Sequence, residues 1–300
     1  LELFKKLSKH PRVEILRIEK KYRKNFEKRQ KLMSVSDLTF LCLPDEAARN
    51  AVCLADELGS NRPILIDAST AHRTSKNWIY GLPELNSKQK KLIAKATKIS
   101  VPGCYATGAN VLINPLIRNS IISKNLTLVI NAISGFSGGG KTLIKHFENE
   151  LSEPFFYYGL KLNHKHLPEI KFHNKLKQFP IFMPSVANFF QGMIVNIPLH
   201  KRWINKKYNF DDVEKLIKSE YKNHRFIKVQ TYKKAFSKQG FFRPDKVLNS
   251  NNLYISVFKN ELTGQLVLSS NFDNLGKGAS GAAIQCMNIV FGFAENMTLE

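Results

Sequence analysis

The feature that most constrains the fold is a strand–helix–strand pattern in the first third of the chain. Residues 37–43 form an apolar run that Pro44-Asp45 closes, and residues 63–68 form a second apolar run. Between them, residues 46–58 carry apolar side chains at helical spacing, and Asp45 is expected to cap this helix. Both runs are continuously hydrophobic, which is typical of parallel strands buried on both faces. The pattern predicts an α/β fold with a Rossmann-type parallel sheet, in which ligands bind at the carboxyl ends of the strands.

One cysteine lies where a third apolar run gives way to a helix. Residues 99–101 end a predicted strand, Pro102-Gly103 form a turn, and residues 106–117 have apolar side chains at helical spacing. Cys104 is therefore expected in or just before the first helical turn, where free N–H groups and the helix dipole favour a thiolate. From geometry alone two interpretations stay open, a reactive nucleophile and a small buried apolar residue.

The pattern changes after this cysteine. A strand over residues 126–133 leads into the glycine-rich stretch 134–141, and residues 141–151 read as a helix. A glycine run before a helix is a weak signal for a phosphate site and equally fits a flexible loop. Three further strands predict a second, α+β domain with a largely antiparallel sheet. They cover residues 191–199, 253–259 and 265–271, the last two joined as a hairpin.

Composition excludes some classes of protein. The formal net charge of +22 invites a nucleic-acid interpretation, but the 46 basic residues are mostly Lys and no nucleic-acid-binding motif accompanies them. A lysine-rich enzyme surface explains the charge better. The four cysteines are widely spaced, so neither a metal site nor a disulfide framework is expected. No apolar run is long enough to span a membrane and no signal peptide is visible, so a cytoplasmic location is expected.

The sequence resembles N-acetyl-gamma-glutamyl-phosphate reductase, especially its shorter bacterial form. The likeness centres on PGCYATG (residues 102–108), which looks like the active-site motif of that family. Ordered motifs along nearly the whole chain support it. They are LCLPDEAA (41–48), IDASTAHR (66–73), YGLPEL (80–85), SGFSGGGK (134–141), HKHLPEI (164–170) and DNLGKGASGAA (273–283).

The resemblance implies a cysteine-based reductase in two domains. Residues 1–103, completed by a helix at 277–293, would bind NADP(H), and residues 104–276 would carry catalysis, substrate binding and oligomerisation. Cys104 would form a thioester, and a histidine would move the proton that releases the aldehyde. His166 is the preferred histidine, because Glu169, one helical turn on, can orient its ring. His164 is the competitor.

The resemblance and the positions of the motifs also suggest binding residues. Arg73 would hold a substrate phosphate or carboxylate, or else form a salt bridge, and Ser134 and Gly135 would bind the acyl phosphate. A basic cluster follows the predicted strand 13–18, and basic side chains there favour the 2′-phosphate of NADP. The expected cofactor-binding residues are Arg17, Lys20, Pro44, Ser69, Asn271, Gly276 and Lys277.

The chain opens in a predicted helix, and its first glycine is Gly59. A dinucleotide-binding unit is expected to begin with a strand and a glycine-rich phosphate loop. We therefore expect the first strand and this loop to be missing, through truncation rather than through loss of cofactor binding.

Together these features predict NADPH-dependent reduction of N-acetyl-glutamyl 5-phosphate to N-acetyl-glutamate 5-semialdehyde and phosphate, a step in arginine biosynthesis. The expected partners are this small substrate and further copies of the same chain, with no membrane and no nucleic acid. Two alternatives stay open. One is an aspartate-semialdehyde-type dehydrogenase, and the other is a non-catalytic polyanion-binding protein on the same scaffold.

Overall fold

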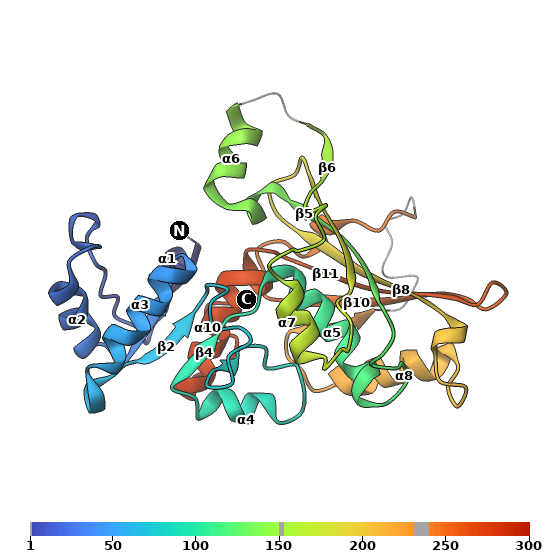
Figure 1. Cartoon of the computed structure of the whole chain (residues 1–300), viewed down its shortest axis with the longest axis horizontal. Helices are drawn as coiled ribbons and strands as arrows, with labels where there is room; N and C mark the ends of the chain where they lie inside the picture. Colours follow the sequence, from blue (N-terminus) through green and yellow to red (C-terminus); the bar gives the residue numbers. More distant parts are fainter. Residues whose placement is uncertain (1, 150–152, 231–239) are drawn as a thin grey trace. The chain divides into compact units, whose positions relative to one another are not determined.

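The computed structural model describes residues 2–149, 153–230 and 240–300, and the chain divides into two compact units (Figure 1). The sequence placed the domain boundary after residue 103 and the whole helix 277–293 in the first domain. The structural units differ from this at residues 84–87, 103 and 277–281, which belong to the second unit. The first unit consists of Leu1–Pro83, Lys88–Pro102 and Ala282–Glu300, and the second consists of Glu84–Ser87 and Gly103–Gly281.

The first unit contains a four-stranded, fully parallel sheet in the order β1-β2-β4-β3. The predicted parallel sheet is therefore confirmed. Burial explains the continuous hydrophobic runs, since Leu65, Ile66 and Ile99 have no exposed surface. The strands are β1 (Leu38–Leu41), β2 (Ile64–Asp67), β3 (Ile79–Tyr80) and β4 (Lys98–Ser100).

The helix after β1 shows how this unit builds its core. Its buried face, which includes Ala51 and Leu54, packs with Met33 and with Leu41 and Leu65 of the sheet. Burying such a face stabilises the unit by roughly 25 cal/mol per Å² of apolar surface. The helices of the unit are α1 (Glu2–Leu7), α2 (Phe26–Ser34), α3 (Asp45–Asp56), α4 (Gln89–Ala94) and α10 (Gly281–Val290), whose first residue belongs to the second unit.

Two details of the first unit differ from the prediction. Residues 13–18 were predicted as a strand but pair with no strand in the described part of the chain, and an apolar run becomes a strand only with a hydrogen-bonding partner. Asp45 was expected to cap α3, but Pro44 occupies the N-cap and Asp45 is the first helical residue. Its carboxylate binds Thr70 instead.

The second unit is built on a seven-stranded mixed sheet in the order β6-β7-β5-β8-β11-β10-β9. Four of its six strand pairs are antiparallel, and β7-β5 and β10-β9 are parallel, so the predicted largely antiparallel sheet is confirmed. The strands are β5 (Val129–Gly135), β6 (Phe155–Tyr157), β7 (Ile181–Ala187), β8 (Met193–His200), β9 (Ile227–Gln230), β10 (Leu253–Asn260) and β11 (Gln265–Phe272).

One face of this sheet is covered by helices, among which α5 lies against β8 and β11 (Figure 1). A Cβ atom at Gly108 would come within 2.6 to 2.8 Å of Ser270, Val195 and Phe272, so only glycine lets the helix lie this close. The helices are α5 (Cys104–Arg118), α6 (Gly140–Asn149), α7 (Leu167–His173) and α8 (Phe210–Tyr221).

The predicted helix over residues 277–293 is two elements. A π-helical turn, η6 (Gly276–Ser280), precedes α10, and such turns often occur at functional sites. In the described part of the chain, no helix has the length and apolarity to cross a bilayer. The 3₁₀ turns are η1 (Lys20–Tyr22), η2 (Gly59–Asn61), η3 (Phe136–Gly139), η4 (Lys201–Trp203) and η5 (Pro244–Val247).

Candidate active site

Cys104 is the first residue of α5, directly after the turn that Pro102 and Gly103 form. Gly103 occupies the N-cap in an extended conformation (φ −70°, ψ 148°), and the Cys104 side chain is half-buried. The first N–H groups of a helix lack intrahelical partners, and its dipole is positive at this end. The predicted position of the cysteine is confirmed, and its surroundings favour a thiolate.

Glu169 binds the turn that carries this cysteine. The carboxylate lies in the first turn of α7, is 1% exposed, and accepts a hydrogen bond from the N–H of Gly103 at 3.1 Å. The sequence suggested that Glu169 orients the ring of His166. That role remains a prediction, and the hydrogen bond from Gly103 shows in addition that the carboxylate holds the main chain one residue before the nucleophile.

Two histidines lie in this part of the unit, and their hydrogen bonds distinguish them. The Nδ1 atom of His164 accepts from the backbone N–H of His166 at 3.1 Å, so the ring hydrogen of a neutral His164 is assigned to Nε2. Burial, together with the charge of Lys165, lowers the pKa of His164 to about 4. This side chain is neutral near pH 7 and poorly suited to moving a proton there.

Like His164, whose ring centroid is 5.7 Å from that of Tyr105, His166 lies beside the nucleophile's helical turn. Its ring centroid is 5.9 Å from that of Tyr105, the residue after Cys104, and 4.8 Å from that of His164. It is 4% exposed and occupies the N-cap of α7. The distances to Tyr105 do not separate the two histidines, and the lowered pKa of His164 is what favours His166 as the acid–base group.

The glycine-rich stretch forms the end of β5, the turn η3 and the start of α6. Ser134 and Gly135 were expected to bind the acyl phosphate, but the N–H of Gly135 donates to the carbonyl of Gly192 at 2.9 Å, so it is not free for a ligand. The Ser134 hydroxyl donates to the carbonyl of Gly135 at 3.0 Å. The exposed part of the stretch begins at Gly138 and includes Lys141. The backbone N–H of Gly135, which was expected to bind the acyl phosphate, therefore holds the fold together instead.

The turn η6 packs directly against the nucleophile. A Cβ atom at Gly278 would lie 2.9 Å from the Cβ of Cys104, and one at Gly276 would lie 2.3 Å from the carbonyl of Ser250. Gly276 was expected to bind the cofactor. The close approach in the structure is to the chain itself, because Gly276 contacts Ser250.

Lys277, predicted to bind the cofactor, has a different partner. Its Nζ lies 2.8 Å from both carboxylate oxygens of Glu84, and the two side chains are 0% and 1% exposed. Its ammonium group is therefore not available to a ligand. Asn271, another predicted cofactor residue, is 2% exposed and donates from Nδ2 to the carbonyl of Arg243 at 2.6 Å.

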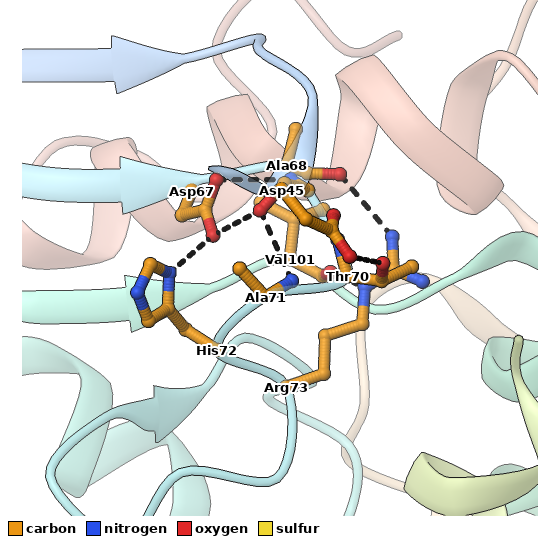
Figure 2. Close-up of polar contacts among 9 residues, drawn as sticks. Asp45, Asp67, Ala68, Thr70, Ala71, His72, Arg73 and Val101 are labelled. Atoms are coloured by element: carbon orange, nitrogen blue, oxygen red, sulfur yellow. Dashed lines mark hydrogen bonds and ion pairs between the residues drawn. The ribbon is translucent and has the colours of Figure 1, made fainter. Parts of the chain in front are cut away.

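In the first unit, the segment after β2 is organised by the buried carboxylate of Asp67 (Figure 2). Its Oδ1 accepts from the N–H of Ser69 at 2.9 Å, and its Oδ2 accepts from the Ser69 hydroxyl at 2.7 Å and lies 2.7 Å from Nδ1 of His72. The His72 ring stacks on Trp78 at 4.2 Å. Ser69 therefore lies at a strand end, as predicted, but its hydroxyl hydrogen is engaged by Asp67.

Arg73 was expected to hold a substrate anion. Its side chain is 8% exposed, and Figure 2 shows the guanidinium at the ends of two neighbouring strands. Nε donates to the carbonyl of Val101 at 2.9 Å, and an Nη atom donates to that of Ala68 at 3.2 Å. These two donors hold the main chain at the ends of β2 and β4.

Asp45 ties α3 to the same segment. Its carboxylate accepts from the N–H of Thr70 at 2.9 Å and from the Thr70 hydroxyl. Burial raises the pKa of Asp45, but the hydrogen bonds from Thr70 and the charges of Arg49 and Arg73 outweigh burial, so this pKa lies below its usual value. The carboxylate stays ionised and holds the segment near neutral pH.

The other predicted cofactor residues lie exposed in the first unit. Pro44 is at the N-cap of α3, where a parallel sheet presents its carboxyl ends. Arg17 has its guanidinium 5.1 Å from the ring centroid of Phe4, and Lys20 begins the turn η1. Their roles remain predictions.

Sequence analysis missed several residues that shape these sites. Glu84 lies inside the quoted motif YGLPEL, but no role was predicted for it, because its partner Lys277 is 193 positions away. Asp67 and Asp45 lie inside the motifs quoted for the resemblance, yet spacing did not reveal whether they face a ligand or the main chain.

A parallel-sheet unit, a second mixed-sheet unit and a cysteine at a helix N-terminus define a protein of the semialdehyde dehydrogenase class. The family model for the semialdehyde dehydrogenase NAD binding domain matches residues 4–93, and that for the dimerisation domain matches residues 104–274. Aspartate semialdehyde dehydrogenase from Francisella tularensis shares this fold. Its structure superimposes with a TM-score of 0.66 at 12% identity, over 90% of this chain and 84% of that one.

Sequence relatives identify the family within this class. The chain is 38% identical to N-acetyl-gamma-glutamyl-phosphate reductase of Trichormus variabilis over 100% of its own length and 95% of the relative. It is 35% identical to N-acetyl-gamma-glutamyl-phosphate reductase 2 of Pseudomonas putida over 97% of its length and 93% of the relative. The chain belongs to the N-acetyl-gamma-glutamyl-phosphate reductase family.

Proposed function

We propose that this chain catalyses the NADPH-dependent conversion of N-acetyl-glutamyl 5-phosphate to N-acetyl-glutamate 5-semialdehyde and phosphate, in arginine biosynthesis. The observation that carries the proposal is Cys104 at the N-terminus of α5, with Glu169 on its turn and His166 against Tyr105, the next residue, in a chain of this family. These groups have the chemistry that an acyl phosphate needs, because a thiolate displaces phosphate and an imidazole moves a proton near pH 7.

In the first step, the Cys104 sulfur attacks the acyl carbon and the bond from that carbon to the phosphate oxygen breaks. Phosphate leaves with the bonding electron pair, and the acyl group stays on the sulfur as a thioester. In the second step, His166 protonates the oxygen that develops on this carbon and then removes the proton as the carbon–sulfur bond breaks. The aldehyde leaves and Cys104 returns to the thiolate.

The first unit fits a dinucleotide. Its strands are all parallel, their carboxyl ends lead to Pro44 and Ser69, and Arg17 and Lys20 are exposed cations that suit a 2′-phosphate. When bound, NADPH supplies the hydride that brings the thioester carbon to the aldehyde level. A neighbour in fold, aspartate semialdehyde dehydrogenase from Candida albicans, was solved with NADP.

The assay that tests the proposal runs the reaction in reverse and measures NADP⁺ reduction with N-acetyl-glutamate semialdehyde, with and without phosphate. We expect turnover that requires phosphate, and a much lower kcat/KM with aspartate semialdehyde. A reversed preference would assign the chain to the aspartate-semialdehyde type. No turnover in a folded protein, combined with salt-dependent binding to a polyanion, would favour a binding protein instead.

We further propose that the chain assembles with copies of itself through the open face of the second unit's sheet. On β7, Ile181 and Met183 are 44% and 39% exposed and point to the same face, and an uncovered apolar face of this kind suits a homo-oligomer. The family model for this domain is also described as a dimerisation domain. The cytoplasmic location and the absence of nucleic-acid binding remain predictions.

Met183→Glu tests this assembly. A carboxylate buried in an apolar interface loses its hydration, so we expect the dissociation constant of the oligomer to rise by about 100-fold or more. Sedimentation equilibrium measures it. Leu262→Glu is the control, because this side chain is 99% exposed at a hairpin tip. A Met183→Glu protein with the mass and dissociation constant of the parent would exclude β7 from the interface.

A further inference from the structure

The helix that follows His166 and carries Glu169 is short and depends on its neighbour for its position. α7 has seven residues, and isolated helices of this length are unstable in water. It lies beside α5, whose first residue is the nucleophile (Figure 1). The hydrogen bond from the Gly103 N–H to the Glu169 carboxylate joins the two helices near their N-terminal ends. One bond does not set the angle between two helices, so contacts farther along must fix it.

Farther along, amide side chains join the same two helices. Asn110 and Asn114 are one turn apart on α5 and lie on the same face of it. Asn174, the C-cap of α7, donates from Nδ2 to Oδ1 of Asn110 at 2.6 Å and to the carbonyl of Ile170 in its own helix at 2.8 Å. Asn114 donates from Nδ2 to the carbonyl of His173 at 3.0 Å. Two side chains of α5 therefore hold the last turn of α7.

These amides are removed from water. Asn110 is 0% exposed, Asn174 is 1% exposed and Asn114 is 5% exposed. A buried amide that loses its partner also loses its hydration, so the pair strongly favours the arrangement in which its hydrogen bond is made. Apolar contacts tolerate small shifts between helices, whereas a buried amide pair specifies one register. The Asn110–Asn174 pair therefore sets where α7 lies on α5.

α5 is itself anchored on α8, which makes it a firm support for α7. Pro115 lies inside α5 and has no N–H, so the carbonyl of Val111, four residues before it, lacks its usual helical donor. The Tyr221 hydroxyl of α8 donates to that carbonyl at 2.7 Å. Arg118, at the end of α5, also binds Glu220 of α8. These contacts hold α5 without involving α7.

We propose that Asn110 and Asn174 are positioning residues of the active site, whose buried amide pair fixes α7 on α5. Through α7, the pair keeps Glu169 on the N–H of Gly103 and keeps His166 beside the first turn of α5. Asn110 lies more than one helical turn after the nucleophile, so the pair acts through the helices rather than on the substrate. The inference rests on the proposed function in taking the first turn of α5 and His166 as the reacting groups.

Hydrogen exchange of the Gly103 amide, followed by NMR on the full chain, tests the pair. Asn174→Leu keeps a similar side-chain volume and removes the donor, so α7 should shift and loosen the bond between this amide and Glu169. We expect Gly103 to exchange about tenfold faster or more, because an unpaired buried amide favours local opening by this amount. The amides of β8 and β11 should keep the parent's exchange rates.

Tyr221→Phe is the matched control, because it removes another buried hydrogen bond to α5 but none to α7. We expect it to lower the urea midpoint of the second unit and to leave the exchange of Gly103 unchanged. Equal exchange of Gly103 in Asn174→Leu and Tyr221→Phe would overturn the proposal. A uniform rise at every amide in Asn174→Leu would also overturn it, since that pattern reports lost stability rather than a moved helix.

A smaller substitution isolates the bond between the helices. The hydroxyl of Asn174→Ser can still donate to the carbonyl of Ile170, four residues before it, but is too short to replace the bond to Asn110. We expect it to speed the exchange of Gly103 as Asn174→Leu does, and it serves as the test where the Leu variant does not fold. Parent-like exchange in Asn174→Ser would show that the pair does not hold α7.

A double variant shows whether the two amides act together. Asn110→Leu removes the acceptor of the pair, and Asn110→Leu/Asn174→Leu removes both partners. If the two amides act as one unit, Gly103 should exchange no faster in the double variant than in the faster single variant. Additive effects would show that each amide acts separately and would overturn the proposal.

Activity gives a second readout of the same variants. A displaced His166 slows proton transfer, so Asn174→Leu should lower kcat about 10- to 100-fold and change the KM for the semialdehyde by less than about twofold. Tyr221→Phe should keep the parent's kcat. Fast exchange of Gly103 with an unchanged kcat in an active protein would overturn the positioning role.

The exchange experiment separates the inference from the proposed function, because it needs neither substrate nor cofactor. Fast exchange of Gly103 in Asn174→Leu supports the inference even where N-acetyl-glutamate semialdehyde is not turned over. Conversely, full reductase activity of the parent with parent-like exchange in Asn174→Leu supports the proposed function and refutes the role of the amide pair.

Discussion

Cys104→Ser is expected to lower kcat for phosphate-dependent NADP⁺ reduction by at least about 10³-fold, while leaving the protein folded. A serine hydroxyl remains protonated near neutral pH, so it cannot displace phosphate as a thiolate does. Serine is also well tolerated at the start of a helix, and Gly278, rather than a larger side chain, faces this position. The loss therefore reports chemistry rather than structure.

A burst experiment makes this prediction sharper. Without phosphate, the parent enzyme with semialdehyde and NADP⁺ should form NADPH in an amount close to one per active site, because the thioester on Cys104 has no phosphate to accept its acyl group. Mass spectrometry of the protein should find that acyl group on Cys104. Cys104→Ser should show neither the burst nor the adduct.

Cys53→Ser is the control, since Cys53 is exposed on α3 in the first unit. It should keep the burst, the adduct and kcat. A burst that persists in Cys104→Ser would mean that another group accepts the acyl chain, and the proposed mechanism would be wrong.

Much of the secondary structure of both units could be predicted from local sequence patterns. Continuous apolar runs predicted β1, β2 and β4, and the Pro102-Gly103 turn predicted the start of α5, because burial on both faces and turn chemistry act over a few residues. The hairpin of β10 and β11 was predicted for the same reason. The prediction of a strand over residues 13–18 was wrong, because a strand needs a hydrogen-bonding partner and a local sequence pattern does not reveal that partner.

Side-chain roles were less accessible, because a residue type does not reveal what it faces. Arg73 was correctly placed after a strand, yet two of its donors bind the carbonyls of Val101 and Ala68. Gly135 and Gly276 were expected to approach a ligand and instead approach the main chain of distant segments. A glycine indicates that another group comes close to its main chain, but it does not show whether that group is a ligand or part of the protein.

The two histidines show the same limit, because the sequence did not reveal which of them has the chemical role. Spacing left His164 and His166 as alternatives, and a single hydrogen bond from the His166 N–H to Nδ1 of His164 distinguishes them. That bond depends on the local backbone at residues 164–166, which the motif letters do not encode. The family resemblance and the lowered pKa of His164 together favour His166.

Lys277→Met is expected to lower the free energy of unfolding of the second unit by about 3–5 kcal/mol, the range found when one partner of a buried ion pair is removed. Lys277 is 0% exposed, and its ammonium lies 2.8 Å from both oxygens of Glu84. Methionine fills much of the same volume but leaves the Glu84 carboxylate buried and without its cation. The midpoint of urea denaturation, followed separately for each unit, measures the change.

Two further variants test whether the lost stability comes from the Lys277–Glu84 ion pair. Lys218→Met breaks the surface contact with Glu214 at 2.6 Å, where the two side chains are 47% and 25% exposed, and should cost less than about 1 kcal/mol. Glu84→Leu/Lys277→Met replaces the whole pair by apolar groups and should recover most of the stability, since no buried charge remains. If Lys277 instead served the cofactor, Lys277→Met would weaken NADP⁺ binding at nearly unchanged stability, and Glu84→Leu would not restore it. These variants therefore decide whether Lys277 binds the cofactor, as the sequence suggested, or pairs with Glu84 to stabilise the fold, as the geometry indicates.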